Sequence, residues 1–195
     1  MAAPPYHTVP AVQLPCPIPI VTKDDFLLRR LTVADYDSNY MQLLQQLTKA
    51  PPVPRATFEA FVVAADACTT GHLVLVAEAP AREAVASVAA AAPLATDDAQ
   101  HATSLPSGAT LAATATLLVE RKLIRGGASA GHIEDVVVDA QFRGTGLGRR
   151  MVDALTDEAR RRGCYKVILD CAESNVPFYE RCGYATKELQ MVRYL

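Results

Sequence analysis

The 195-residue chain lacks the features that mark a membrane, secreted or metal-binding protein. No apolar run approaches the ~18 residues that a bilayer crossing needs, and the N-terminus has no basic stretch followed by an apolar core of secretory type. Its cysteines form no Cys-x-x-Cys pair and are odd in number, which argues against a zinc site and a disulfide framework. A net charge of −2 gives no sign of a nucleic-acid partner. We therefore expect a soluble cytoplasmic protein with no metal, no membrane contact and no nucleic-acid partner.

Length and composition predict one globular domain over residues 25–195, because half of the residues are hydrophobic. Residues 1–24 are rich in proline and have no periodicity, so we predict an extended or disordered arm. Residues 79–110 are rich in alanine and poor in large apolar side chains. They bury too little surface to offset their ordering entropy, which favours an inserted surface loop, with room for a short helix over 82–92.

Apolar periodicity predicts the remaining elements. Strands are expected over residues 26–31, 73–76, 111–124, 131–138, 167–169 and 188–194, with 131–138 and 167–169 buried. One helix should begin at Thr32 or Asp35 and end before the prolines of 51–54, and a second should begin at Thr57 and bury Phe58, Phe61, Val62 and Ala65. A third should bury Leu147, Met151, Val152, Leu155 and Ala159 and end at Gly163, and a short helix should span 175–182. This order predicts a mixed α/β layer architecture.

A glycine-rich loop connects the strand over 131–138 to the helix that follows it. It reads Arg143-Gly144-Thr145-Gly146-Leu147-Gly148, and Arg149 comes next. Glycine lets the backbone approach a ligand closely, and a helix start offers N–H groups and a partial positive charge to an anion. The loop fits neither the dinucleotide pattern GxGxxG nor the P-loop pattern GxxxxGK. We therefore predict a phosphate or pyrophosphate site, with a glycine-rich turn that binds no ligand as the structural alternative.

Arg143, Gly146 and Gly148 fit the Arg/Gln-x-x-Gly-x-Gly/Ala signature of the GNAT superfamily of N-acetyltransferases. Residues 131–138 (GHIEDVVV), 163–171 (GCYKVILDC) and 175–184 further resemble the eukaryotic glucosamine-6-phosphate N-acetyltransferases. The similarity is dense over 111–195 and thin over 26–78, while the arm and the insertion have no counterpart. It implies the GNAT fold, an α/β fold with a mixed, mostly antiparallel sheet flanked by helices. It also implies transfer of an acetyl group from acetyl-coenzyme A to the 2-amino group of glucosamine 6-phosphate, a step toward UDP-N-acetylglucosamine.

The resemblance also implies site residues and an assembly. Coenzyme A is expected at Val136, Val137, Val138, Arg143, Gly144, Thr145, Gly146, Leu147, Gly148, Arg149, Asp170, Asn175 and Tyr179. Glucosamine 6-phosphate is expected at Thr48, Lys122, Arg125, Glu134, Asp135, Tyr165, Lys166 and Arg193. Catalytic roles are expected for Tyr179, Asp170 and Glu134. Family members are homodimers that share the C-terminal strand, which would bring Arg193 to the partner's sugar phosphate.

The chemistry limits what these groups must do. A sugar amine resembles an α-amino group with a pKa of ~7.7–8, so its deprotonation near pH 7 costs about 1 kcal/mol and needs no strong base. Glu134 and Asp135 are strand neighbours that face opposite sides unless a bulge intervenes. We favour Asp135 for the sugar and leave the role of Glu134 open. Tyr179 is a weaker acid than a thiol, which favours a hydrogen bond to the developing thiolate over proton donation.

Two other functions stay open on the sequence. One is an acetyltransferase of the same fold for another amine, such as a protein lysine or a polyamine; the other is a non-catalytic acyl-coenzyme A sensor. The cations expected at the acceptor site favour a phosphorylated acceptor over a basic one. Tyr179 favours a catalyst, although packing alone would also explain it. Cys164, Cys171 and Cys182 are expected in the core, as small apolar side chains.

Overall fold

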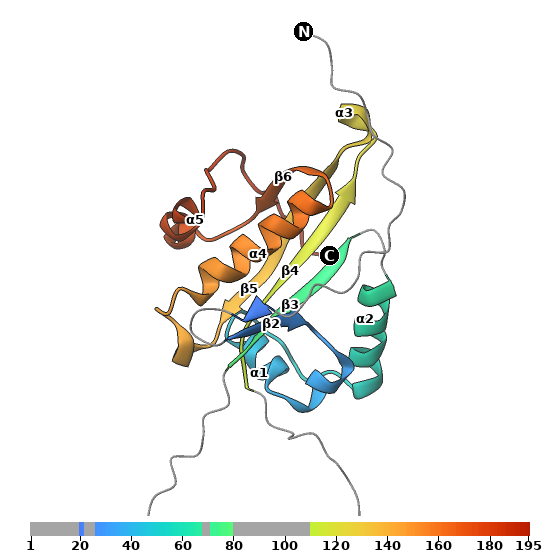
Figure 1. Ribbon diagram of the computed structural model, residues 1–195, viewed down its shortest axis with the longest axis vertical. Helices are drawn as coiled ribbons and strands as arrows, with labels where there is room; N and C mark the ends of the chain where they lie inside the picture. Colours follow the sequence, from blue (N-terminus) through green and yellow to red (C-terminus); the bar gives the residue numbers. More distant parts are fainter. Residues whose placement is uncertain (1–19, 22–25, 68–70, 80–109) are drawn as a thin grey trace, which may run out of the picture.

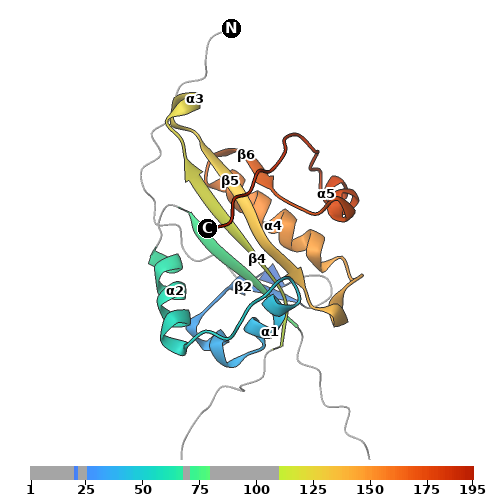
Figure 2. The same cartoon turned by 180° about the vertical axis from the view of Figure 1, so that it is seen from behind.

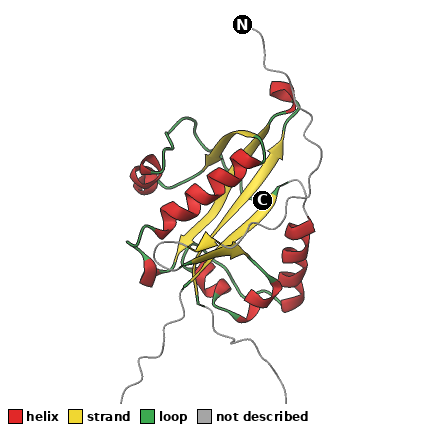
Figure 3. Ribbon diagram, in the orientation of Figure 1, coloured by secondary structure: helices red, strands yellow, loops and turns green. Residues whose placement is uncertain are grey.

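The computed structural model describes residues 20–21, 26–67, 71–79 and 110–195, which form a six-stranded sheet with helices on both faces (Figures 1 and 3). The strands lie in chain order: β1 (Ile20–Val21), β2 (Leu27–Arg30), β3 (His72–Glu78), β4 (Leu111–Arg121), β5 (Ser129–Val138) and β6 (Cys164–Leu169). Neighbouring strands are antiparallel except β5 and β6, which are parallel. The predicted mixed α/β architecture is confirmed.

Two apolar clusters lie on opposite faces of the sheet, because side chains alternate along each strand. The helical elements are η1 (Val33–Asp37), α1 (Tyr40–Gln45), α2 (Arg55–Ala67), α3 (Ile124–Gly127), η2 (Ala140–Phe142), α4 (Leu147–Arg161), η3 (Glu173–Asn175) and α5 (Val176–Arg181). In β3, Leu73, Leu75 and Ala77 face the cluster of α4, whereas Val74 and Val76 face that of α1 and α2. None of the described helices has the length and apolar character that a bilayer crossing needs.

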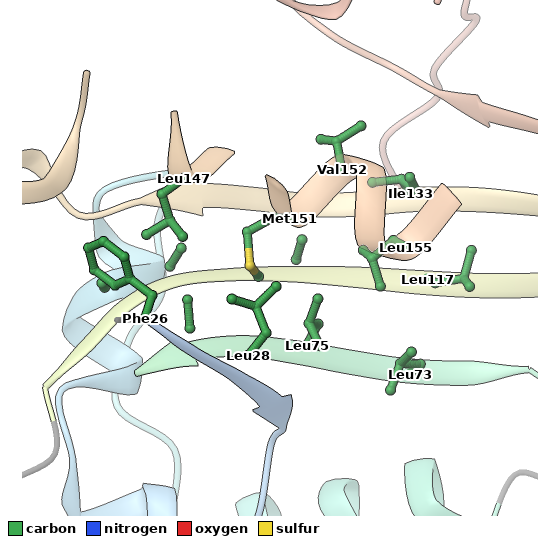
Figure 4. Close-up of a cluster of buried hydrophobic side chains, with 14 of the residues drawn as sticks. Phe26, Leu28, Leu73, Leu75, Leu117, Ile133, Leu147, Met151, Val152 and Leu155 are labelled. Carbon is green, nitrogen blue, oxygen red and sulfur yellow. The ribbon is translucent and has the colours of Figure 1, made fainter. Parts of the chain in front are cut away.

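Helix α4 confirms the periodicity prediction most directly. Its predicted core positions, Leu147, Met151, Val152, Leu155 and Ala159, are all at most 1% exposed. Figure 4 shows Leu147, Met151 and Leu155 on the side of α4 that faces β2, β3 and β4. A stripe of this width buries a helix against a sheet and leaves the arginines of its other face in solvent. The helix starts at the glycine loop, so its packing fixes where that loop lies.

The first helix is interrupted, although one continuous helix was predicted. The Asp35 carboxylate accepts hydrogen bonds from the Thr32 N–H and hydroxyl, at 2.8 and 3.0 Å, and so caps η1. The Asn39 side chain then binds both backbone groups of Leu111, donating to the carbonyl at 3.0 Å and accepting from the N–H at 2.8 Å. These hydrogen bonds to β4 separate η1 from α1. No local pattern in the sequence predicts them, because their partners lie 72 positions apart.

Other predictions need correction. Phe61, which was predicted to be buried, is 43% exposed. The strand that was predicted to reach Ile124 ends at Arg121, and Ile124 lies in the short turn of α3. Strand β6, which was predicted to be buried, is an edge strand with Ile168 36% exposed, because β5 is its only strand partner within the described residues. Cys171 is exposed.

The predicted strand over 188–194 is absent, and the chain there has no regular secondary structure. Ile20 and Val21 of the proline-rich arm pair with β2. The rest of that arm, the alanine-rich insertion over 80–109 and its expected short helix lie outside the described residues.

Candidate functional site

A β-bulge in β5 lies at the centre of the site. Thr114 pairs with Val137, and Thr116 pairs with Glu134, so Ala115 of β4 faces two residues of β5, Asp135 and Val136. Asp135 has a φ of 53°, which is unusual for a residue other than glycine. Neighbours in a regular strand face opposite sides of the sheet, and a bulge can change this. Such a bulge is present at Asp135, next to Glu134.

The two parallel strands stop pairing at this bulge. The last registered pair is Ile133 with Leu169, where β6 ends, whereas β5 continues to Val138. Beyond Ile133, the β6 side of β5 therefore has no strand partner in the described chain. Asp170 follows β6 at this point and approaches Glu134. Burial, and then the charges of Asp170 and Asp135, raise the pKa of Glu134 above the usual glutamate range, although His132 opposes the shift.

Two glycines shape the loop between η2 and α4. Gly144 and Gly146 have φ values of 82° and 79°, in the left-handed region. A Cβ atom at either position would meet no atom within 4 Å, so both face open space. Gly148 differs, because its Cβ would lie 3.3 Å from Phe178 Cζ and from Val138 Cγ2. The first two glycines therefore permit the turn, and the third permits close packing of α4 against α5.

Arginines brace this loop at the N-terminus of a 15-residue helix. The Arg143 Nε donates to the Val138 carbonyl at 3.1 Å, and Arg150 Nη2 donates to the Thr145 carbonyl at 3.0 Å. Arg149 is exposed, and its Nε lies 3.4 Å from Asp153 Oδ2. Cations, a helix start and open glycine backbone together fit a pyrophosphate. Arg150 was not predicted; the only sequence signal for it is its place in the first turn of the helix.

Tyr179 lies on α5, beside Phe178, whose ring packs against Gly148. Its ring centroid is 4.9 Å from that of Phe178 and 6.3 Å from that of Tyr184. Burial, and then the neighbouring Cys171, Cys182 and Tyr184, raise the pKa of the Tyr179 phenol. The phenol therefore stays protonated, and able to donate a hydrogen bond, throughout the neutral pH range.

The expected acceptor residues do not form one site within the chain. Arg125 Cζ lies 5.0 Å from the Tyr165 ring centroid and Lys166 Nζ lies 5.9 Å from it, at the hairpin that α3 closes. In the same hairpin, Lys122 Nζ lies 2.5 Å from Glu120 Oε2. Helix α1 lies at the other end of the sheet from α3 (Figures 1 and 2).

Three further expected residues lie at the ends of helices or in the C-terminal segment. Thr48 stays at the end of α1, because its N–H donates to the Leu44 carbonyl at 3.2 Å. Arg193 is exposed in the C-terminal segment. Asn175 caps α5. Among the residues that the structure describes, no group of three or more histidine, cysteine or acidic side chains could hold a metal ion.

Known proteins resemble this chain over most of its length. Residues 69–184 match the acetyltransferase (GNAT) family. The chain is 39% identical over 167 residues to the probable glucosamine 6-phosphate N-acetyltransferase 2 of Oryza sativa subsp. japonica, a match that covers 86% of each protein. The crystal structure of glucosamine-6-phosphate N-acetyltransferase from Arabidopsis thaliana has a TM-score of 0.70 at 34% identity and covers 87% of this chain and 97% of that one. The crystal structure of a Trypanosoma brucei acetyltransferase has a TM-score of 0.66 at 33% identity, with coverage of 88% and 100%.

Proposed function

This chain belongs to the acetyltransferase (GNAT) family, and from that premise we propose that it acetylates the 2-amino group of glucosamine 6-phosphate. It is an acyltransferase, and acetyl-coenzyme A is the co-substrate of its family. The observation that carries the choice of acceptor is the 39% identity, over 86% of both chains, to a probable glucosamine 6-phosphate N-acetyltransferase. No other amine acceptor is favoured by a specific feature of the site.

Donor binding would use the loop and the free side of β5. The loop of Arg143 to Gly148 at the start of α4 would hold the pyrophosphate, with Arg149 beside it. The pantetheine arm would run along β5 from Val136 to Val138, where β6 no longer pairs. In this arrangement the Val136 N–H would polarise the thioester carbonyl, as an oxyanion donor does.

The reaction we propose is a direct transfer. The neutral amine attacks the thioester carbonyl, the new C–N bond forms as the C–S bond breaks, and the amine loses a proton. Glu134 suits the role of proton acceptor, directly or through one water, because its raised pKa makes it a better base than an ordinary glutamate. Tyr179 would donate a hydrogen bond to the developing thiolate, and Asp135 would bind the sugar.

The same proposal includes a homodimer that shares the C-terminal segment. Leu189, Met191 and Tyr194 are each at least 90% exposed in the single chain. Within the described residues β6 is an edge strand, and Gln190 Nε2 donates at 2.8 Å to Asp170 Oδ2 directly after it. Apolar side chains and an open strand edge together favour β-strand pairing with a second copy. Such a dimer would bring the hairpin cations, or Arg193, of one copy to the bulge of the other. Size-exclusion chromatography with light scattering tests it, and a monomer at micromolar concentration would contradict it.

Thiol release from acetyl-coenzyme A tests the activity. We expect release with glucosamine 6-phosphate and far less with glucosamine or a histone-tail peptide, because the phosphate supplies the charge that the cations recognise. Release with the peptide alone would replace the proposal with a protein acetyltransferase. Binding of coenzyme A without release from any acceptor would identify a sensor. A cytoplasmic location remains a prediction of the amino-acid sequence, which cell fractionation tests.

A further inference from the structure

The side chain of Gln46 connects the end of α1 to the chain that enters the glycine loop. Its Nε2 donates to Asp139 Oδ2 at 2.8 Å, and its Oε1 accepts from the Ala140 N–H at 2.9 Å. The amide therefore uses both of its ends on two consecutive residues that are more than 90 positions away in the sequence. Two bonds from one rigid amide fix both the position and the orientation of this backbone.

Asp139 extends these hydrogen bonds toward the glycine loop. It is 8% exposed, and its second carboxylate oxygen accepts from the Gln141 N–H at 2.8 Å, which caps η2. The Asp139 carbonyl accepts from the Phe142 N–H at 2.9 Å, and the Phe142 carbonyl accepts from the Thr145 hydroxyl at 2.8 Å. A continuous chain of hydrogen bonds therefore runs from Gln46 to the residue that precedes the N-cap of α4.

We infer that Gln46 is a positioning residue that holds the Arg143–Gly148 loop in the geometry that binds the pyrophosphate of coenzyme A. The inference rests on the proposed function only in taking this loop as the pyrophosphate site. The side-chain hydrogen bonds of Gln46 go to Asp139 and Ala140, so it acts on the loop through these two residues. Pre-organised N–H groups bind an anion more tightly than mobile ones, because less order is lost on binding.

The test compares two donors that differ in the pyrophosphate. In Gln46→Ala we expect the KM for acetyl-coenzyme A to rise about tenfold, the scale of a lost hydrogen bond to a charged partner. With S-acetyl-pantetheine, which has no pyrophosphate or nucleotide, kcat/KM should stay within about twofold of the wild type. Gln45→Ala is the matched control, because Gln45 is the preceding residue and its amide donates to the Ala50 carbonyl at 3.0 Å, away from the loop.

The outcomes separate this inference from the proposed function. An equal loss with both donors, or no loss with either, would overturn the positioning role. Gln46→Met keeps the length of the side chain without the amide and gives the same readout if Gln46→Ala does not fold. Calorimetry with coenzyme A alone completes the test: a wild type that does not bind coenzyme A would refute the proposed function, whereas equal affinities of the wild type and both Gln46 variants would refute only the role of Gln46.

Discussion

Replacing Tyr179 with phenylalanine removes one hydroxyl and tests how the proposed reaction stabilises its leaving group. The ring stays packed between Phe178 and Tyr184, so the fold of α5 should be retained. No hydrogen bond joins the Tyr179 hydroxyl to another of the described residues, which leaves it available to a ligand. Its raised pKa keeps the phenol protonated, and the hydroxyl therefore serves as a donor rather than as an anion.

The magnitude follows from the charge of the partner. A hydrogen bond to a charged group contributes about 1.5–3 kcal/mol. Because each 1.36 kcal/mol is tenfold in rate, kcat should fall about 10- to 150-fold in Tyr179→Phe. The affinity for coenzyme A should change little, since the bond strengthens only as the thiolate forms.

Steady-state thiol release and calorimetry with coenzyme A measure the two quantities separately. Tyr184→Phe is the matched control, because Tyr184 belongs to the same aromatic cluster and its hydroxyl bonds instead to the Thr156 hydroxyl at 2.7 Å. This control should lose some stability and keep its kcat. Equal turnover in Tyr179→Phe, or an equal fall in both variants, would refute the assignment.

Three further predictions concern charge and packing. Asp170→Asn should move the acidic limb of the pH–rate profile to lower pH, because the negative charge of Asp170, together with burial, raises the pKa of Glu134. An acidic limb that stays in place would show that Glu134 does not control it. Asp35→Asn should lower the free energy of unfolding by about 3 kcal/mol at pH 7. Burial opposes ionisation of Asp35, but the hydrogen bonds and charge of Arg29 outweigh it and lower its pKa. The stabilisation is therefore present above the unfolded pKa and is lost as the pH falls through the folded pKa; urea titrations that show the same difference at pH 3 as at pH 7 would contradict this. Gly131→Ala should cost about 1–3 kcal/mol by overpacking, because its Cβ would lie 3.2 Å from two side-chain carbons, and an unchanged melting temperature would contradict it.

Local patterns in the sequence were enough to predict the glycine loop and the helix that we propose for donor binding. The spacing of Leu147, Met151, Leu155 and Ala159 predicted one buried helix face, and every one of these residues is buried. The glycines before that helix predicted backbone open to a ligand, and Gly144 and Gly146 have positive φ and face open space. Both features depend on contacts and backbone angles within a few residues, so neighbours in the chain determine them.

Features that depend on distant partners could not be predicted in this way. The interruption between η1 and α1 depends on the hydrogen bonds of Asn39 with Leu111 of β4. The constraint on the chain that enters the glycine loop depends on the hydrogen bond of Gln46 with Asp139. The amino-acid sequence around Asn39 and Gln46 is compatible with a continuous helix. The strand expected over 188–194 has an apolar pattern but pairs with no strand in the part of the chain that the structure describes, so its pattern alone did not determine its structure.

The amino-acid sequence alone was enough to recognise the family, through the resemblance of residues 131–138, 163–171 and 175–184 to known members. It also determined the glycine loop and the helix that presents it, because apolar period and glycine spacing act locally. Only the tertiary structure decided that Asp135 and Val136 share a bulge and that the charge of Asp170 acts on Glu134 where β6 ends. It also decided that the hairpin cations lie at the far end of β4 and β5 from this bulge. The physical reason is that strand register, and with it the facing of each side chain, is a property of pairs of strands. Side chains alternate between the two faces along a single strand, and the register with the partner strand determines at which residues a bulge interrupts this alternation.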